Sequence, residues 1–128
     1  MKFTPTIPQR KFQAGRQPKP VTISDCASIE LAPDEQVTFR TAQGAEYDVA
    51  RKSWGFYATP SLNGRLKSFG LRPALARSGT GQHYILLLER GNEAAFEDYL
   101  ASEEMRVVCW LDDEDTLAKL GTVLGEDT

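Results

Sequence analysis

Residues 84–88, Tyr-Ile-Leu-Leu-Leu, form an apolar run that constrains the fold more than any other part of the chain. A run that is apolar at every position predicts a central strand over 83–90 that is covered on both faces. The spacing after it predicts a helix over 93–102, capped by Asn92, and a second buried strand over 106–111. A right-handed β-α-β crossover would make the two strands parallel, with an antiparallel return as the alternative.

The part of the chain before this run predicts antiparallel pairing. Gly44 supplies the glycine of a tight hairpin between two short β-type runs. Such runs lie at 21–24, 29–31, 36–41, 45–51, 54–58 and 71–78. With the carboxyl-terminal half they predict a single α+β domain over 21–125, with a mixed, mainly antiparallel sheet and two or three helices. A chain of 128 residues with 41% apolar content suits one core.

A helix is also predicted over 60–69. Thr59 can cap its free amides, and Pro60 suits the first helical position. Gly70 stands where a residue in the left-handed conformation would end the helix. Gly64 would cost the middle of this helix about 1 kcal/mol relative to alanine, so a structured loop is the alternative.

Residues 1–20 predict a disordered basic arm. They hold several cations and prolines but no Asp or Glu. Such an arm could tether the chain to an anionic partner, or it could be a solvated tail whose removal leaves the fold intact. The prolines are Pro5, Pro8, Pro18 and Pro20.

Cys26 and Cys109 are the only cysteines, and they stand far apart without a Cys-x-x-Cys pair. This predicts reduced thiols, with neither a disulfide framework nor a zinc site. No apolar run approaches the roughly 18 residues of a membrane span, and the residues after Lys2 lack the apolar core of a signal peptide. We therefore expect a cytoplasmic protein that does not enter the membrane, and the sequence predicts no cofactor.

An acidic cluster at 112–115, Asp-Asp-Glu-Asp, precedes leucines at helical spacing. Carboxylates at the start of a helix interact favourably with its free amides, so capping explains the cluster. A magnesium site is the alternative. Adjacent acids rarely converge on one ion, however, and the spacing of an EF-hand loop is absent, so no metal site is predicted.

The stretch 51–78, called the basic segment below, holds cations and aromatic residues but no Asp or Glu, in a chain of net charge -3. Arginine forks suit phosphate or carboxylate, and aromatic faces can stack a base or a sugar. The alternative is structural, with the aromatics facing inward and the cations paired with acids such as Glu93, Glu97, Asp98 or those of the carboxyl-terminal helix. As ligand-binding residues the segment offers Trp54 and Tyr57 for stacking, Arg65, Lys67 and Arg72 for charge, and Asn63 for orientation.

No catalytic fingerprint is present in the sequence. We therefore expect a non-enzymatic binding or adaptor module that holds an anionic small molecule or an acidic protein surface through the basic segment. The alternative is a small enzyme for an anionic metabolite, with His83 or Tyr57 as acid or base. A lone histidine at a strand edge can equally be structural. Nucleic acid is a less favoured partner because the pI is near 5.2. The sequence leaves the oligomeric state open.

Overall fold

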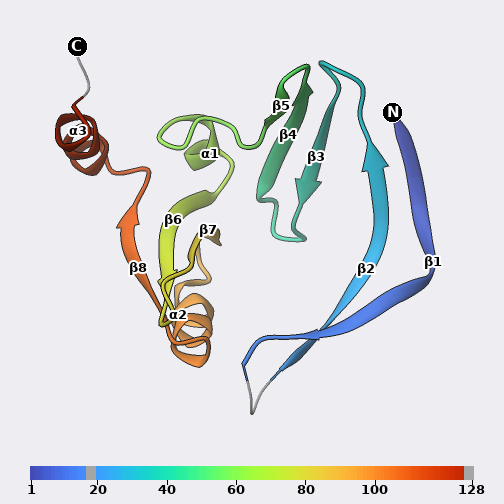
Figure 1. Ribbon diagram of the computed structural model, residues 1–128, viewed down its shortest axis with the longest axis horizontal. Coiled ribbons are helices and arrows are strands. Elements are labelled where there is room, and N and C mark those ends of the chain that lie inside the picture. Colours follow the sequence, from blue (N-terminus) through green and yellow to red (C-terminus); the bar gives the residue numbers. More distant parts are fainter. Residues whose placement is uncertain (17–19, 126–128) are drawn as a thin grey trace. The chain divides into compact units, whose positions relative to one another are not determined.

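The computed structural model describes residues 1–16 and 20–125, so residues 17–19 of the predicted arm and residues 126–128 lie outside the described part. Within that part the chain is an α+β protein with eight strands and three helices (Figure 1). The elements are β1 (Lys2–Ala14), β2 (Val21–Glu30), β3 (Gln36–Arg40), β4 (Glu46–Lys52), β5 (Gly55–Tyr57), α1 (Arg65–Ser68), β6 (Leu71–Ser78), β7 (His83–Glu89), α2 (Glu93–Ser102), β8 (Met105–Trp110) and α3 (Glu114–Val123). The strands form three antiparallel sheets, ordered β1-β2, β3-β4-β5 and β7-β6-β8.

The chain divides into two compact units. The first unit comprises Met1–Val37 and Val49–Ala58, and the second comprises Thr38–Asp48 and the chain from Thr59 onwards. Strands β3 and β4 contribute residues to both units, because each strand crosses a boundary. A single domain over 21–125 stays a prediction.

The first unit contains a long antiparallel hairpin of β1 and β2, so the prediction of a disordered arm over 1–20 is wrong. The register places Phe3 opposite Ile29 and Phe12 opposite Ile23. Residues directly opposite one another in an antiparallel pair lie on the same side of it, so each phenylalanine lies beside an isoleucine of the other strand. The composition of this segment, rich in proline and cations, therefore does not prevent it from forming a strand.

The prolines of β1 are accommodated by an irregularity in the strand. The ladder shifts register between Pro5 and Arg10, and Pro8 falls inside this shift. Proline has no backbone N–H and is tolerated in strands only at edges and bulges. A composition that suggests disorder is therefore compatible with a strand here.

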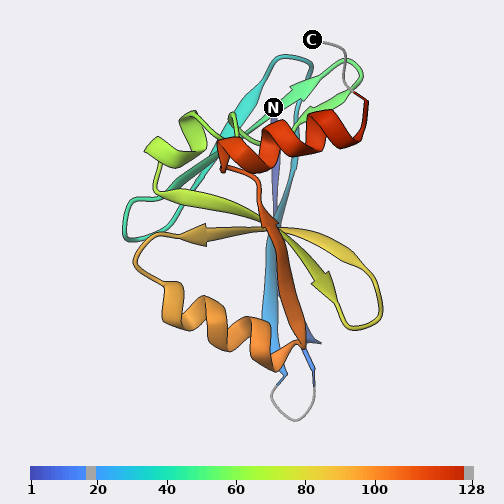
Figure 2. The same cartoon turned by 90° about the vertical axis from the view of Figure 1, so that its left-hand side faces the viewer.

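The central strand of the second unit is β6, with β7 and β8 at the edges of its sheet (Figure 2). Both edge strands run antiparallel to β6, for example with Arg72 opposite Leu88 and Leu75 opposite Cys109. They therefore point in the same direction, joined through α2, with β6 between them. The predicted parallel direction is correct, but the two strands are not neighbours, and the predicted mixed sheet is wrong because every neighbouring pair is antiparallel.

The apolar run 84–88 lies on the edge strand β7, so its predicted place at the centre of the sheet is wrong. Tyr84 and Ile85 are about half exposed, whereas Ala74 and Ala76 of β6 are fully buried. An apolar run indicates that a strand can be buried, but it does not determine the position of the strand in the sheet. That position depends on which distant segments pair with it.

Helix α1 is a single turn of four residues, so the predicted alternative of a structured loop describes this region better than the helix over 60–69. Gly64 is the residue before the turn, and the hydroxyl of Ser61 accepts a hydrogen bond from Arg65 N at 2.8 Å. Gly70 follows with φ of 85°, the left-handed conformation predicted for it.

Burial of Leu66 holds this short turn in place. Its side chain is 0% exposed, whereas a helix of this length has no stability of its own. Ala45 and Leu71 complete the buried cluster, and partly buried side chains pack against it: Tyr47, Leu62 and Leu87. The cluster fixes the part of the basic segment that leads into β6.

Capping accounts for Asp113 of the acidic cluster at 112–115, as predicted, whereas Asp112 pairs with Arg72. The carboxylate of Asp113 accepts hydrogen bonds from Thr116 N at 3.0 Å and from Thr116 Oγ1 at 2.7 Å. Among the described residues, no three His, Cys, Asp or Glu side chains gather as a metal site would require.

Helix α2 has the predicted bounds, and Asn92 stands at its start as predicted but without the predicted side-chain bond. Asn92 makes no side-chain capping bond, and the carboxylate of Glu93 accepts from Gly91 N instead. No helix in the described part of the chain combines the length and the apolar character needed to cross a membrane.

Candidate anion-binding site

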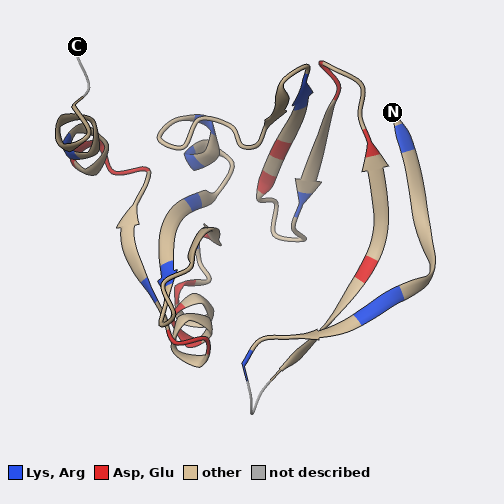
Figure 3. Cartoon of the chain, in the orientation of Figure 1, with Lys and Arg blue, Asp and Glu red and all other residues tan. Residues whose placement is uncertain are grey.

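A surface pocket of about 370 Å³ lies in the second unit, and its walls come from four parts of the chain. Lys67 belongs to α1, Arg72 to β6 and Arg90 to the turn between β7 and α2, while Asp112 and Asp113 belong to the turn between β8 and α3. Figure 3 shows the cations of α1 and β6 and the acids before α3. Three cations and two carboxylates therefore meet at one pocket.

Arg72 is held by a bidentate ion pair with Asp112. Its Nε donates to Oδ2 at 2.9 Å, and its Nη2 donates to Oδ1 at 3.0 Å. The guanidinium carbon also lies 4.1 Å from the ring centroid of Trp110, which in turn contacts Phe96 with ring centroids 5.9 Å apart. Two parallel hydrogen bonds and an aromatic face fix the plane of the guanidinium. The Arg72 guanidinium therefore lines the pocket in a fixed orientation.

These contacts set the protonation of the carboxylates. The hydrogen bond from Arg72 holds the pKa of Asp112 below its ordinary value, against the opposing effect of burial. The same bond raises the pKa of Arg72. Hydrogen bonds from the Thr116 hydroxyl and amide lower the pKa of Asp113, although the negative charge of Asp112 opposes this. Both carboxylates are therefore ionised at neutral pH.

Lys67 and Arg90 form no side-chain hydrogen bond or ion pair within residues 1–16 and 20–125. Their backbones are nevertheless fixed, because Arg90 N donates to Gly70 O at 2.9 Å and Gly70 N donates to Lys67 O at 3.2 Å. Gly70 thus ties the two segments together. Neither cation has a direct ion pair in the described part of the chain, although the charge of Arg90 lowers the pKa of Asp112 and of Glu93. The pocket therefore offers two anchored cations to an anion.

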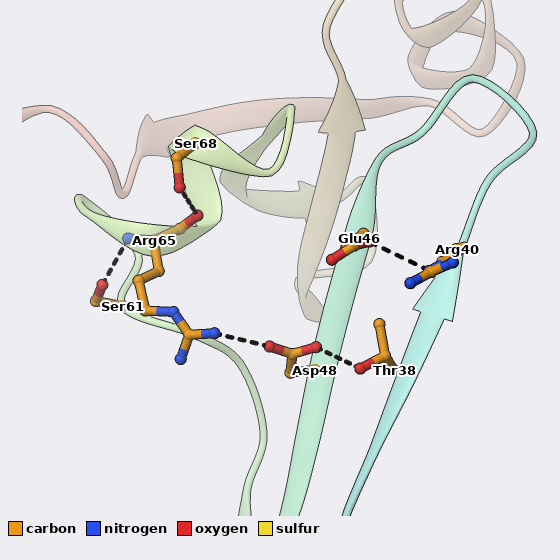
Figure 4. Close-up of polar contacts among 7 residues, drawn as sticks. All are labelled: Thr38, Arg40, Glu46, Asp48, Ser61, Arg65 and Ser68. Carbon is orange, nitrogen blue, oxygen red and sulfur yellow. Dashed lines mark hydrogen bonds and ion pairs between the residues drawn. The ribbon is translucent and has the colours of Figure 1, made fainter.

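Arg65 has a structural partner in Asp48 (Figure 4). Its Nη2 donates to Asp48 Oδ2 at 3.0 Å, and Thr38 Oγ1 donates to Asp48 Oδ1 at 2.7 Å. Asp48 is only 8% exposed, and a buried carboxylate needs such donors. This contact follows the structural alternative for the basic segment, in which its cations pair with acids elsewhere, although the sequence does not single out Asp48 as the partner.

Asn63 also has a partner outside the pocket. Its Nδ2 donates to Oε1 of Glu114 at 2.9 Å, which ties the loop before α1 to the first turn of α3. Its role in orienting a ligand stays a prediction.

The two aromatic candidates lie in the first unit, on and beside β5. Trp54 is 72% exposed, and Tyr57, opposite Ala50 of β4, is exposed as well. Their stacking role stays a prediction. Of the six predicted residues, the structure brings Lys67 and Arg72 together at the pocket.

His83 is exposed at the start of the edge strand β7, opposite Arg77 of β6. It does not line the pocket of Lys67 and Arg72, and Tyr57 belongs to the other unit. Neither residue is among those that line this pocket, and the alternative of acid or base catalysis stays a prediction.

Sequence reasoning missed Arg90, Asp112 and Asp113 as parts of the pocket. The acidic cluster draws attention to both carboxylates, but a capping role already explains Asp113 and does not indicate a pocket. The place of Asp112 beside Arg72 follows from pairing beyond the end of β8, where Leu111 N donates to Pro73 O at 2.9 Å. Such a contact joins distant segments, so residue spacing does not reveal it.

Comparisons with models of protein families, with curated proteins and with solved structures find no match to this chain. Its function is therefore inferred from the chemistry of the pocket.

Lowering the pH should reduce the free energy of unfolding, because Asp112 and Asp113 have lowered pKa values in the folded protein. Their contribution is complete above the pKa of an unfolded aspartate, about 3.9, and is lost as the pH falls through the lower native values. As the pH falls, these carboxylates are protonated at a higher pH in the unfolded chain than in the folded chain, so acid lowers the free energy of unfolding. Urea unfolding between about pH 7 and about pH 3 measures the effect.

The variant Asp113→Asn is the control, since it keeps an oxygen for the cap but has no charge to lose. It should be less stable than the wild type at neutral pH, and the difference should shrink as the pH falls below the pKa of an unfolded aspartate and through the lowered native pKa. A stability difference that stays constant over this range would contradict an ionic contribution from Asp113.

Proposed function

We propose that the protein is a non-enzymatic binding module that holds an anionic group in the pocket of Lys67, Arg72 and Arg90. The group is a carboxylate or phosphate of a small molecule, or an acidic side chain of a partner protein. The observation that carries the proposal is the convergence of cations from α1, β6 and the turn before α2 on one pocket. Two of these cations have no ion pair in the described part of the chain.

The charges of the pocket support an anionic ligand. Asp112 is neutralised by its bidentate partner Arg72, and Asp113 is engaged by the first turn of α3. The pocket nevertheless keeps a positive balance, because its lining holds three cations and two carboxylates. Lys67 and Arg90 are the cations available to a ligand, and the fixed plane of the Arg72 guanidinium orients it. A volume of about 370 Å³ lies within the usual range of small-ligand sites.

The first experiment is a thermal-shift screen against phosphorylated metabolites, nucleotides and dicarboxylates at constant ionic strength. A ligand that binds the native state alone raises its stability in proportion to the logarithm of ligand concentration over Kd. Constant ionic strength separates specific binding from general screening. A concentration-dependent rise in Tm identifies the ligand class.

The double variant Lys67→Gln/Arg90→Gln should weaken binding of a ligand found in this screen by at least about tenfold, because each charge-assisted hydrogen bond contributes roughly 1.5–3 kcal/mol. Isothermal titration measures the loss. Lys11→Gln, which removes an exposed lysine of β1, should leave the affinity unchanged. Equal affinity of the double variant and the wild type would refute the proposal.

The cytoplasmic location expected from the sequence belongs to this proposal. It is supported by two free thiols, Cys26 and Cys109. Reducing compartments keep cysteines unpaired. The location is checked by fractionation of cells that produce the tagged protein.

A further inference from the structure

A second group of basic side chains crosses the sheet of the second unit. Arg77 on β6 lies directly opposite His83 on β7 and directly opposite Arg106 on β8. Directly opposite residues project from the same face of a sheet. The three side chains therefore form one row across three strands, called the basic row below.

The two arginines of the basic row have no direct acidic partner in the part of the chain that the structure describes. Neither Arg77 nor Arg106 forms a side-chain hydrogen bond or ion pair among the described residues, and both are exposed. Like charges directly opposite one another in a sheet destabilise it. An anion placed between the two guanidinium groups would relieve this repulsion, so the folded chain gains stability when the anion binds.

The surface beside the row is hollowed. A pocket of about 290 Å³ includes both arginines, and its walls hold one acid, Glu104. The backbone at Gly79 is uncrowded, since a Cβ atom added there would contact only the carbonyl oxygen of Glu104, at 3.7 Å. The lining residues are Arg77, Ser78, Gly79, Glu104, Met105 and Arg106.

The row is separate from the pocket of Lys67 and Arg90. Arg72 and Arg77 lie five positions apart on β6, which is an odd number, so they project from opposite faces of the sheet. Five residues of strand also span roughly 16 Å. One small anion therefore cannot reach both sites.

We propose that the basic row is a second binding site, which takes the phosphate group of a small phosphorylated molecule. Two arginine forks match the oxygens of a phosphate, and the His83 ring can donate a further hydrogen bond. On the same face of β6 to β8 the neighbouring positions are aliphatic or thiol side chains, Leu75, Ile85 and Cys109. They offer no aromatic ring on which a base could stack, which favours a phosphate group over single-stranded nucleic acid.

The test uses the Lys67→Gln/Arg90→Gln variant as its background, so that the first pocket does not contribute. Inorganic phosphate, added at constant ionic strength, should raise the Tm of this variant. Adding Arg77→Gln/Arg106→Gln should abolish the rise, while the protein without phosphate melts no lower than its parent. A phosphate response that survives the arginine substitutions overturns the proposal, and so does the absence of any response in the background variant.

Two further arms sharpen the result. Arg77→Lys/Arg106→Lys keeps the charge but loses the fork, so Kd for phosphate should rise by about tenfold; an unchanged Kd overturns recognition by the forks. A phosphate monoester such as glycerol phosphate should bind as inorganic phosphate does. Binding of a single-stranded oligonucleotide without binding of the monoester overturns the proposed ligand class.

Discussion

Leu66→Ala should lower the free energy of unfolding by about 3 kcal/mol, within the range measured for leucine truncations in cores. The Leu66 side chain is 0% exposed and packs with Ala45 and Leu71. Its turn is too short to form without this contact. Urea unfolding followed by tryptophan fluorescence measures the loss, with an unchanged m-value showing that the unfolded states are comparable.

The matched control is Leu124→Ala, which truncates a leucine that is 80% exposed. It should change stability by less than about 0.5 kcal/mol. Leu66→Ala should also weaken anion binding at the first pocket, since Lys67 is the next residue of the same turn. Equal stability of the two leucine variants would show that the cluster around Leu66 is not the core of the second unit.

The features that were predicted correctly carry local signals. The bounds of α2 follow from apolar spacing over one segment, and the left-handed Gly70 follows from its place after a helical stripe. The capping role of Asp113 likewise depends on residues within one turn. In each case the physical cause lies within a few positions of its effect.

The features that were predicted wrongly depend on distant pairing. In the hairpin of β1 and β2, Phe3 lies opposite Ile29, and the composition of the first strand alone does not reveal that partner. The edge position of residues 84–88 follows from the register of β6 with both neighbours. Local propensity gives a weak preference, and tertiary pairing overrides it.

The candidate site divides in the same way. The sequence points to Lys67 and Arg72 because the basic segment contains no Asp or Glu, and this pattern can be seen within one stretch of the chain. It misses Arg90 and Asp112 because they reach the pocket through backbone pairing with Gly70 and Pro73. The charge pattern of the basic segment therefore predicts that its cations need anionic partners. Only the pairing of the strands shows which acids neutralise some of these cations and which cations are left without an ion pair in the described part of the chain.

Asp112→Asn should lower the free energy of unfolding by about 2 kcal/mol, the scale of a hydrogen bond to a charged group. The Asp112 side chain is 7% exposed, and Arg72 is 34% exposed, so the variant leaves a partly buried guanidinium without its countercharge. The same change should strengthen anion binding at the first pocket by several-fold, because it removes a negative charge from the wall and frees the fork of Arg72. Thermal unfolding and isothermal titration measure the two effects.

This opposition between stability and affinity separates the role of Asp112 from general damage. Asp98→Asn, an exposed carboxylate of α2, should change neither quantity. Arg72→Gln should lower stability as Asp112→Asn does but should also lower affinity, since the oriented cation is lost. In the double variant Arg72→Gln/Asp112→Asn the stability losses should be less than additive, because each single change already breaks the same pair. If Asp112→Asn weakened anion binding instead, the orientation that Asp112 gives to the Arg72 guanidinium would matter more for binding than the negative charge that the change removes.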